Sequence, residues 1–279
     1  MTNPERVSIH GCHSRDYCSH APDTLEDLLA EYHRQDYAWV GVTEHMPADK
    51  KAFILSEEAE EGYTLETLHD RFDCYVEKIA ELKSSYAGKL DIIFGFETEV
   101  YEGYERWLEE LIDRYQPEYI VGSVHFVNGI GIDSSPEKLA LAAEKSGGMD
   151  ALYCDYFDIQ LSLIERFDPR VIGHFDLIRL HDPDYLDRLQ SREVWSRIER
   201  NLSAIQVRGS ILDFNLAAIR KGLNEPYPCE PITQLAIEMG IPLVPGEDAH
   251  TVDTVGMDRE KGVSWLQELG GNTDWLRPA

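Results

Sequence analysis

The chain has 279 residues, of which 43% are hydrophobic and 28% charged, as is typical of a folded globular protein. Its 52 acidic side chains outnumber the 26 Lys and Arg. The resulting formal charge of −26 argues against a nucleic-acid partner, because the phosphate backbone would be repelled. No apolar run approaches the roughly 18 to 20 residues of a membrane helix, and Met1–Ser8 is too polar for a signal peptide. We therefore expect a cytoplasmic protein without a membrane partner.

The cysteines exclude another class of protein. They are odd in number and form no CxxC pair, which argues against a disulfide framework and against a structural zinc knuckle. We interpret them as mostly reduced packing thiols: Cys12, Cys18, Cys74, Cys154 and Cys229. Cys12 lies between two histidines, but a hydrolytic metal site is better served by nitrogen and oxygen ligands, so we assign no metal to it.

Seven short apolar runs, rich in Val and Ile, predict strands. They are Val7–His10, Ala38–Thr43, Leu90–Thr98, Tyr119–His125, Arg170–Phe175, Ser210–Asn215 and Ile241–Pro245. Segments with helical spacing of apolar residues lie between them. They begin at Thr24 and end near Gln35, begin at Thr64 and end before Gly88, and then span Tyr104–Tyr115, Pro136–Glu144, Asp150–Phe167, Glu193–Val207 and Pro231–Met239.

Strands that alternate with helices indicate parallel strands joined by right-handed crossovers. No Ser-, Gly- or Pro-rich linker interrupts the alternation, so we expect one α/β domain over residues 1–279. Seven strands predict a distorted or incomplete TIM-like (β/α) barrel. The acidic stretch Glu57–Glu61 is interpreted as a solvated helix face or lid, and Gly129-Ile130-Gly131 as a turn, because it lacks the third glycine of a dinucleotide-binding loop.

Seven of the ten histidines follow predicted strands: His10, His13, His20, His45, His125, His174 and His250. In a (β/α) barrel the carboxyl ends of the strands meet on one face, so these imidazoles are expected to share one pocket. Two carboxylates, Glu97 and Asp248, end the third and seventh strands. The other three histidines, His33, His69 and His181, fall in helices or a polar turn and receive structural roles.

So many imidazoles in one pocket would be poorly solvated and would repel one another if protonated. Metal ions resolve this conflict, and neutral imidazoles with carboxylates suit zinc, iron or manganese. Nine ligands exceed the three or four protein ligands of one catalytic zinc. The sequence therefore predicts a centre of two or three divalent ions.

The motifs that carry these residues resemble the polymerase and histidinol phosphatase (PHP) superfamily over about residues 7–250. They are His10-Gly11-Cys12-His13-Ser14, Thr43-Glu44-His45, Gly95-Phe96-Glu97, Ser123-Val124-His125, Gly173-His174 and Asp248-Ala249-His250. Further motifs resemble the histidinol-phosphate phosphatase branch: Cys18-Ser19-His20-Ala21, Gly122-Ser123-Val124-His125-Phe126, Gly173-His174-Phe175-Asp176-Leu177 and Arg220-Lys221-Gly222 before Tyr227-Pro228.

The resemblance implies a PHP-type seven-stranded barrel with a trinuclear metal centre. By analogy, one metal takes His10, His13, Glu97 and Asp248. A second takes Glu97, His125 and His174, and a third takes His20, His45 and His250. Glu97 would then bridge two metals.

Two departures from the family pattern stand out. One residue usually separates the first two histidines, whereas Gly11 and Cys12 both intervene here, so His10 reaches the metal only if Gly11 permits a bulge. The segment Asn215–Arg220 also lacks the small polar residues common after that asparagine.

The resemblance further implies hydrolysis of a phosphate monoester, with L-histidinol phosphate of histidine biosynthesis as the expected substrate. Two metals would activate a bridging water for in-line attack, with Glu97 and Asp248 as catalytic ligands. Arg220 follows the sixth strand, and its guanidinium could clamp phosphate oxygens. Three carboxylates are unranked candidates to contact the substrate amine or to protonate the leaving oxygen: Asp16, Asp133 and Asp176.

Two alternatives remain open from the sequence. One is a PHP phosphoesterase acting on nucleotides or nucleic-acid ends, against which the acidic composition counts. The other is a metal-binding or regulatory protein with a catalytically silent site. The sequence does not indicate the oligomeric state or the metal identity.

Overall fold

A computed structural model describes residues 4–279, so the first three residues of the polar Met1–Ser8 segment lie outside the described part of the chain. Its main sheet has seven parallel strands in the order β1-β2-β3-β4-β7-β8-β9. Their bounds are β1 Arg6–Cys12, β2 Tyr37–His45, β3 Asp91–Glu97, β4 Tyr119–Gly122, β7 Val171–Ile172, β8 Ile211–Asn215 and β9 Leu243–Gly246. The seven predicted strands are confirmed.

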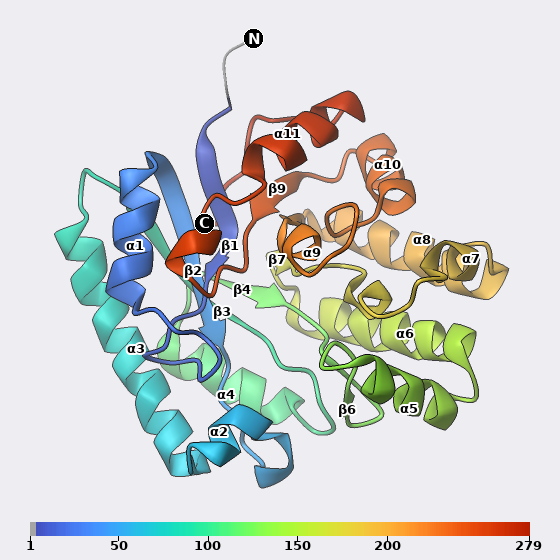
Figure 1. Ribbon diagram of the computed structural model, residues 1–279, viewed down its shortest axis with the longest axis horizontal. Coiled ribbons are helices and arrows are strands. Elements are labelled where there is room, and N and C mark those ends of the chain that lie inside the picture. Colours follow the sequence, from blue (N-terminus) through green and yellow to red (C-terminus); the bar gives the residue numbers. More distant parts are fainter. Residues whose placement is uncertain (1–3) are drawn as a thin grey trace.

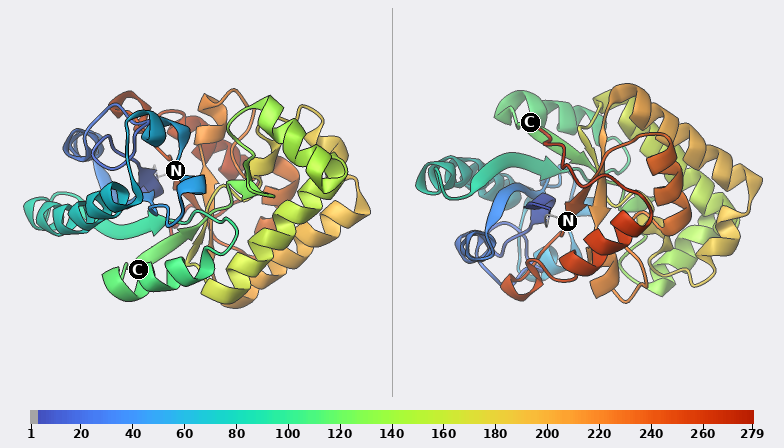
Figure 2. Two further views of the ribbon diagram at one scale, coloured as in Figure 1. Left: turned by 90° about the horizontal axis from the view of Figure 1, so that it is seen from below. Right: turned by 90° about the horizontal axis from the view of Figure 1, so that it is seen from above.

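The sheet curls into a nearly closed barrel, because its first and last strands meet at their carboxyl ends. Cys12 and Ala249 form a parallel bridge just beyond β9, and the amide of His13 donates to the carbonyl of Ala249 at 2.9 Å. Figure 1 shows the strands at the centre with helices around them, and Figure 2 shows the same arrangement from below and above. The predicted α/β barrel is therefore the observed fold.

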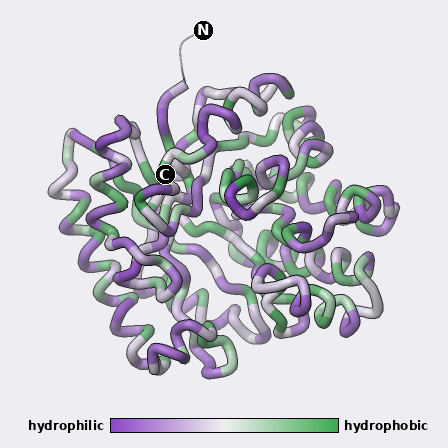
Figure 3. The backbone as a smooth tube through the Cα atoms, in the orientation of Figure 1, coloured by the Kyte–Doolittle hydropathy of each residue, from purple (hydrophilic) through white to green (hydrophobic). Residues whose placement is uncertain are grey.

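The helices lie outside the barrel: α1 Leu25–Arg34, α2 Ser56–Glu60, α3 Leu65–Ser85, α4 Glu105–Tyr115, α5 Pro136–Ser146, α6 Met149–Phe167, α7 Tyr185–Leu189, α8 Arg192–Arg208, α9 Ala217–Arg220, α10 Glu230–Glu238 and α11 Arg259–Glu268. Short 3₁₀ turns occupy η1 Lys51–Phe53, η2 Leu177–Arg179 and η3 Val252–Thr254. In Figure 3, hydrophobic and hydrophilic residues alternate along many of these helices, as expected for helices with one buried face. Within residues 4–279, none of the helices is long and apolar enough to cross a membrane.

Side chains inside the barrel change character along the strands. Near the amino ends they form an apolar cluster: Val7, Ile9, Trp39, Ile93, Tyr119, Val121, Val171, Ile211 and Val244. We call this end the base of the barrel, and the opposite end, where the carboxyl ends of the strands meet, the mouth.

Glycines separate the base from the mouth. The hydroxyl of Tyr119 reaches across the interior to donate to the carbonyl of Ile9 at 2.5 Å. A Cβ on Gly41 would lie 1.8 Å from that hydroxyl oxygen, and a Cβ on Gly95 would lie 3.0 Å from the Tyr119 ring. Glycine at both positions therefore makes room for the Tyr119 ring between the apolar base and the mouth.

The structure also adds elements that the sequence analysis omitted. Phe126–Val127 (β5) and Ile130–Gly131 (β6) form a small antiparallel hairpin around the predicted turn. Asn128 and Gly129 have φ of 54° and 73°, the left-handed pair that a two-residue hairpin turn requires. The helix α11 was not predicted, whereas the acidic Glu57–Glu61 stretch falls on α2 and its end, as the solvated-helix interpretation expected.

Candidate metal centre

All nine predicted metal ligands lie together at the mouth. Seven of them line a pocket of about 670 Å³: His20, His45, Glu97, His125, His174, Asp248 and His250. The other two, His10 and His13, are buried against the same group, behind the pocket surface. The gathering of distant histidines on one face of the barrel is therefore confirmed.

Glu97, at the end of β3, lies at the centre of the group and is only 1% exposed. Its Oε1 lies 2.9 Å from His174 Nε2 and 3.5 Å from His125 Nε2. Its Oε2 lies 3.1 Å from His45 Nδ1 and 3.6 Å from the Nε2 atoms of both His10 and His13. The two carboxylate oxygens therefore face different imidazoles, which is the arrangement that a bridging carboxylate needs.

A bulge in β1 brings His10 into this group. Ser8 pairs with Val40 and Cys12 pairs with Val42, so four steps along β1 match only two along β2. Gly11 allows this distortion, because a Cβ there would lie 2.5 Å from the carbonyl oxygen of Gly41. The unusual spacing between the first two histidines is thus accommodated in the strand.

The same bulge gives His10 a fixed orientation. Its Nδ1 lies 2.9 Å from Asp213 Oδ2, which leaves Nε2 directed toward Glu97. A carboxylate behind the ring is the usual support of a metal-binding histidine. Asp213 was not predicted, although its place in β8, two residues before Asn215, put it near the mouth.

Asp248 lies on the loop after β9 in a left-handed conformation, with φ of 48°. Its Oδ1 is 3.2 Å from His13 Nε2, and its Oδ2 is 3.7 Å from Lys221 Nζ. Arg220 holds this loop, because its Nη2 donates to the carbonyls of Glu247 at 2.7 Å and Asp248 at 3.0 Å. The loop backbone that carries Asp248 is thus fixed from α9.

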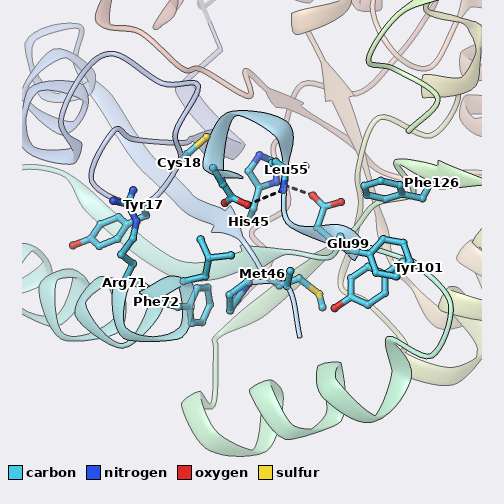
Figure 4. Close-up of a pocket in the computed structure, with 15 residues that line it drawn as sticks. Tyr17, Cys18, His45, Met46, Leu55, Arg71, Phe72, Glu99, Tyr101 and Phe126 are labelled. Atoms are coloured by element: carbon cyan, nitrogen blue, oxygen red, sulfur yellow. Dashed lines mark hydrogen bonds and ion pairs between the residues drawn. The ribbon is translucent and has the colours of Figure 1, made fainter. Parts of the chain in front are cut away.

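His20, His45 and His250 form the outer part of the centre, beside the pocket. His20 Nε2 and His250 Nε2 are 3.0 Å apart. Glu99 lines the same pocket, with its carboxylate oxygens 2.9 Å from His45 Nδ1 and from His125 Nδ1. Figure 4 shows the Glu99 carboxylate directed at the His45 ring. Glu99 was missed, although it follows Glu97 by two residues, the period that places side chains on one side of an extended chain.

Buried nitrogen atoms without partners test whether metal ions fit here. Within residues 4–279, four of these imidazoles have buried ring nitrogens that no hydrogen bond satisfies: His10 Nε2, both nitrogens of His13, both of His45, and His174 Nδ1. Leaving such groups unpaired costs about 1–3 kcal/mol each, which a cation would offset. Subsets of the nine residues also place one donor atom each within 4.8 Å of one another, including His10 with His13 and Glu97, and Glu97 with His125 and His174. The donor set is suited to metal ions.

The surroundings of the site shift the pKa values of its imidazoles in opposite directions. Burial and the adjacent His45 lower the pKa of His13 well below its ordinary value. Burial would also lower the pKa of His125, but Glu99 and Glu97 raise it to about 9. Burial opposes the charge of Glu97, yet His10 and His125 hold the pKa of its carboxyl well below the usual range. Glu97 is therefore an anion that attracts cations.

The predicted substrate residues are placed less uniformly. Asp133 lines the pocket, whereas Asp16 lines a separate surface depression and accepts from the amide of Leu25 at 2.9 Å. Asp176 is buried, and its Oδ2 accepts from Arg179 Nε at 2.8 Å. The structure therefore brings only Asp133 of these three carboxylates to the pocket.

Arg220 also differs from its expected arrangement. One of its terminal nitrogens is used by the loop carbonyls, so the free bidentate clamp expected from the sequence is not what the structure shows. The physical reason is that α9 begins directly after β8, which places the guanidinium beneath the loop that follows β9. The next residue, Lys221, is a cation that lines the pocket and was not predicted.

The barrel and the cluster at its mouth define an α/β barrel protein equipped to hold metal ions. A family model described as "PHP domain" matches residues 10–217, which is more than half of the chain. The chain therefore belongs to the PHP domain family. Arg220, Asp248 and His250 lie beyond the matched residues.

Known proteins extend the comparison. A Schizosaccharomyces pombe protein named "Probable histidinol-phosphatase" is 36% identical over 269 residues, covering 95% of this chain and 87% of the relative. The crystal structure of a candidate histidinol phosphatase from Listeria monocytogenes matches with a TM-score of 0.80 and 27% identity, covering 92% of this chain and 99% of that one.

A third comparison supports the fold alone. Histidinol phosphate phosphatase from Lactococcus lactis, solved with zinc, L-histidinol and phosphate, has a TM-score of 0.65 at 15% identity. That match covers 96% of this chain and 95% of the other.

Proposed function

We propose that this protein is a metal-dependent phosphomonoesterase that hydrolyses L-histidinol phosphate to L-histidinol and phosphate in histidine biosynthesis. The observation that carries the proposal is Glu97, whose two oxygens face different imidazoles at the floor of an open pocket. The Schizosaccharomyces pombe relative, similar over 95% of the chain, supports the choice of substrate.

We assign the metal ligands in three groups. His10, His13, Glu97 and Asp248 would hold one ion, and Glu97, His125 and His174 a second. His20, His45 and His250 would hold a third. The ions would be zinc, iron or manganese, and their number would be two or three. The unpaired buried nitrogens and the central carboxylate support these assignments.

When bound, the metal ions would supply a nucleophile at neutral pH and cancel charge on the phosphate. The chain's own groups would hold the centre and orient the substrate. Asp213 and Glu99 fix the rings of His10 and His125 through Nδ1, leaving Nε2 for binding. Arg220 fixes the Asp248 loop, and its own contact with phosphate stays a prediction.

The pocket walls suit a substrate that carries both positive and negative groups. Lys221 and Lys138 line the pocket and can attract phosphate oxygens, while Glu57 and Asp133 line it with negative charge. L-Histidinol phosphate has an amine and an imidazole beside its phosphate, so an acidic wall would favour it over a purely anionic ester. We assign Asp133 to the amine, because it is the one candidate carboxylate from the sequence that lines this pocket.

We also propose that residues 1–279 form one domain and that the protein acts in the cytoplasm. The continuous strand order and the absence of a spanning helix within residues 4–279 support this view. The acidic composition supports the expectation that nucleic acid is not a partner.

The direct test is specific activity after metal reconstitution, with L-histidinol phosphate compared with a panel of other phosphomonoesters, nucleotides and p-nitrophenyl phosphate. We expect L-histidinol phosphate to give the highest kcat/KM. A nucleotide that is turned over faster would overturn the substrate assignment in favour of a nucleotide phosphoesterase. No turnover of any ester by a fully metal-loaded protein would indicate a silent metal-binding protein.

Metal dependence needs its own experiment. Elemental analysis of protein purified without chelators should find two or three equivalents of zinc, iron or manganese. Chelation should abolish phosphatase activity, and returning divalent metal should restore it. Full activity in metal-free protein would contradict the proposal.

A further inference from the structure

Cys18 lies among the outer histidines of the metal centre. It sits in the loop between β1 and α1 and is only 3% exposed. Its Sγ lies 3.3 Å from both ring nitrogens of His20. Cys18 and His45 both line a neighbouring pocket, which Figure 4 shows.

Four donors converge at this point. Cys18, His20, His45 and His250 each offer one ligand atom, and these four atoms all lie within 4.8 Å of one another. Four ligands of nitrogen and sulfur are the number and type that tetrahedral zinc takes, with bonds of about 2.0–2.1 Å to nitrogen and about 2.3 Å to sulfur.

Packing does not account for the position of this thiol. The other buried cysteines, Cys12, Cys154 and Cys229, belong to the main hydrophobic core, whereas Cys18 is not part of that cluster. The loop is also held in place, because the amide of Cys18 donates to the carbonyl of Ser14, whose own amide donates to Glu44 Oε1 at 2.9 Å. The sulfur is thus presented to the histidines by an anchored turn.

We propose that Cys18 is a fourth ligand, as a thiolate, of the metal ion held by His20, His45 and His250. This inference rests on the proposed function and deepens it. The metal–sulfur bond forms as the thiol proton leaves to solvent. Because sulfur is a soft donor, this position favours zinc over manganese, while the groups around Glu97 contain only nitrogen and oxygen.

The test is the near-ultraviolet spectrum of the full-length protein loaded with Co²⁺ in place of its native ions. A thiolate bound to Co²⁺ gives a charge-transfer band that imidazole and carboxylate ligands lack. We expect this band in the wild type, in Cys12→Ser and in Cys74→Ser, and its loss in Cys18→Ser. Cys12 and Cys74 are the controls: Cys12 is a buried core residue within the first motif, and Cys74 is exposed. Cys18→Ser should also weaken binding of one metal equivalent by about 10- to 100-fold or more.

A second measurement does not depend on any variant folding. X-ray absorption of the zinc-loaded wild type should detect a sulfur neighbour at about 2.3 Å. A fully cobalt-loaded wild type without the band, or a band that survives in Cys18→Ser, would overturn the assignment. Hydrolysis of L-histidinol phosphate without the band would refute the thiolate alone, whereas a band without hydrolysis would refute the proposed function and leave the ligand in place.

Discussion

The two ends of the barrel interior are built from the same strands but obey opposite rules. At the base, nine inward side chains pack as an apolar cluster without charge. At the mouth, buried histidines and carboxylates crowd together with several unpaired nitrogens. Strand β3 shows the change within five residues, from Ile93 through Gly95 to Glu97. Packing at the base therefore stabilises the folded state, whereas the unpaired polar groups at the mouth destabilise it, as is common where a site is pre-organised.

The largest effect is expected from a substitution at the centre of the mouth. Replacing Glu97 with Gln removes the anion that faces imidazoles on both of its oxygens, so kcat should fall by at least about 10³-fold. Glu99→Gln is the matched control, because Glu99 contacts only the Nδ1 atoms of His45 and His125 and its loss should cost less. The measurement is kcat with L-histidinol phosphate at saturating metal. Turnover near the wild-type value in Glu97→Gln would show that this residue does not bridge metals.

The next effect concerns the base. Ile93→Ala should lower the free energy of unfolding by about 2–5 kcal/mol, because it leaves a cavity in the apolar cluster. Metal content and kcat should stay close to the wild-type values, since Ile93 lies two inward positions below Glu97. Denaturant unfolding measures the stability, and Ile93→Val, expected to cost about 0.5–1.5 kcal/mol, is the graded control. An equal loss of kcat in both variants would show that the base and the mouth are not separable.

Arg220, at the end of α9, is hydrogen bonded to the loop that carries Asp248. Arg220→Ala should lose about 2–4 kcal/mol of transition-state stabilisation, judged from kcat/KM. The loss should be similar for L-histidinol phosphate and p-nitrophenyl phosphate, because neither a loop anchor nor a phosphate contact reads the leaving group. A loss confined to L-histidinol phosphate would place Arg220 at the amine instead. Metal content of the variant then separates the two roles, since only the anchor supports Asp248.

The smallest effect is a pH dependence of the metal-free protein. The folded-state pKa of His13 is lowered below its ordinary value, so the folded protein binds this proton less readily than the unfolded chain does. Its contribution to stability is present above about pH 6.5 and is lost as the pH falls, by at most about 1.4 kcal/mol per pH unit. Denaturation at pH 7.5 and 5.5 should therefore show a smaller difference for His13→Gln than for the wild type. An equal difference in both proteins would contradict the lowered pKa.

Most of the fold could be predicted from the sequence, because seven apolar runs alternate with amphipathic helices. The ends of strands were less accurate: the run Tyr119–His125 is a strand only to Gly122, since the chain turns there toward the hairpin. The short β5 and β6 were missed because two-residue strands carry no periodicity. The Asn128-Gly129 pair was the available signal for their turn.

The ligand cluster could be predicted because histidine placement and barrel topology act together. The residues that support the cluster could not be predicted, because Asp213, Glu99 and Lys221 are ordinary charged residues until the fold shows which ligands they contact. Asp176 was a candidate substrate contact because it follows a strand-end histidine in sequence. Its side chain is instead buried, where it pairs with Arg179. A side chain's direction after a strand depends on the loop that follows it, and spacing alone does not give that direction.

The close packing around the glycines beneath the mouth has an evolutionary consequence. A Cβ on Gly11 would meet the carbonyl of Gly41, and a Cβ on Gly41 would meet both Tyr119 and the carbonyl of Ile9. The residues at positions 41 and 119 therefore cannot change independently, whereas Gly11 meets a backbone oxygen that any residue at position 41 would carry. A mutational library that varies any of these positions singly would recover only the starting residue at the two glycines. Relatives with a side chain at position 41 should carry both a smaller residue at position 119 and a displaced backbone at position 9.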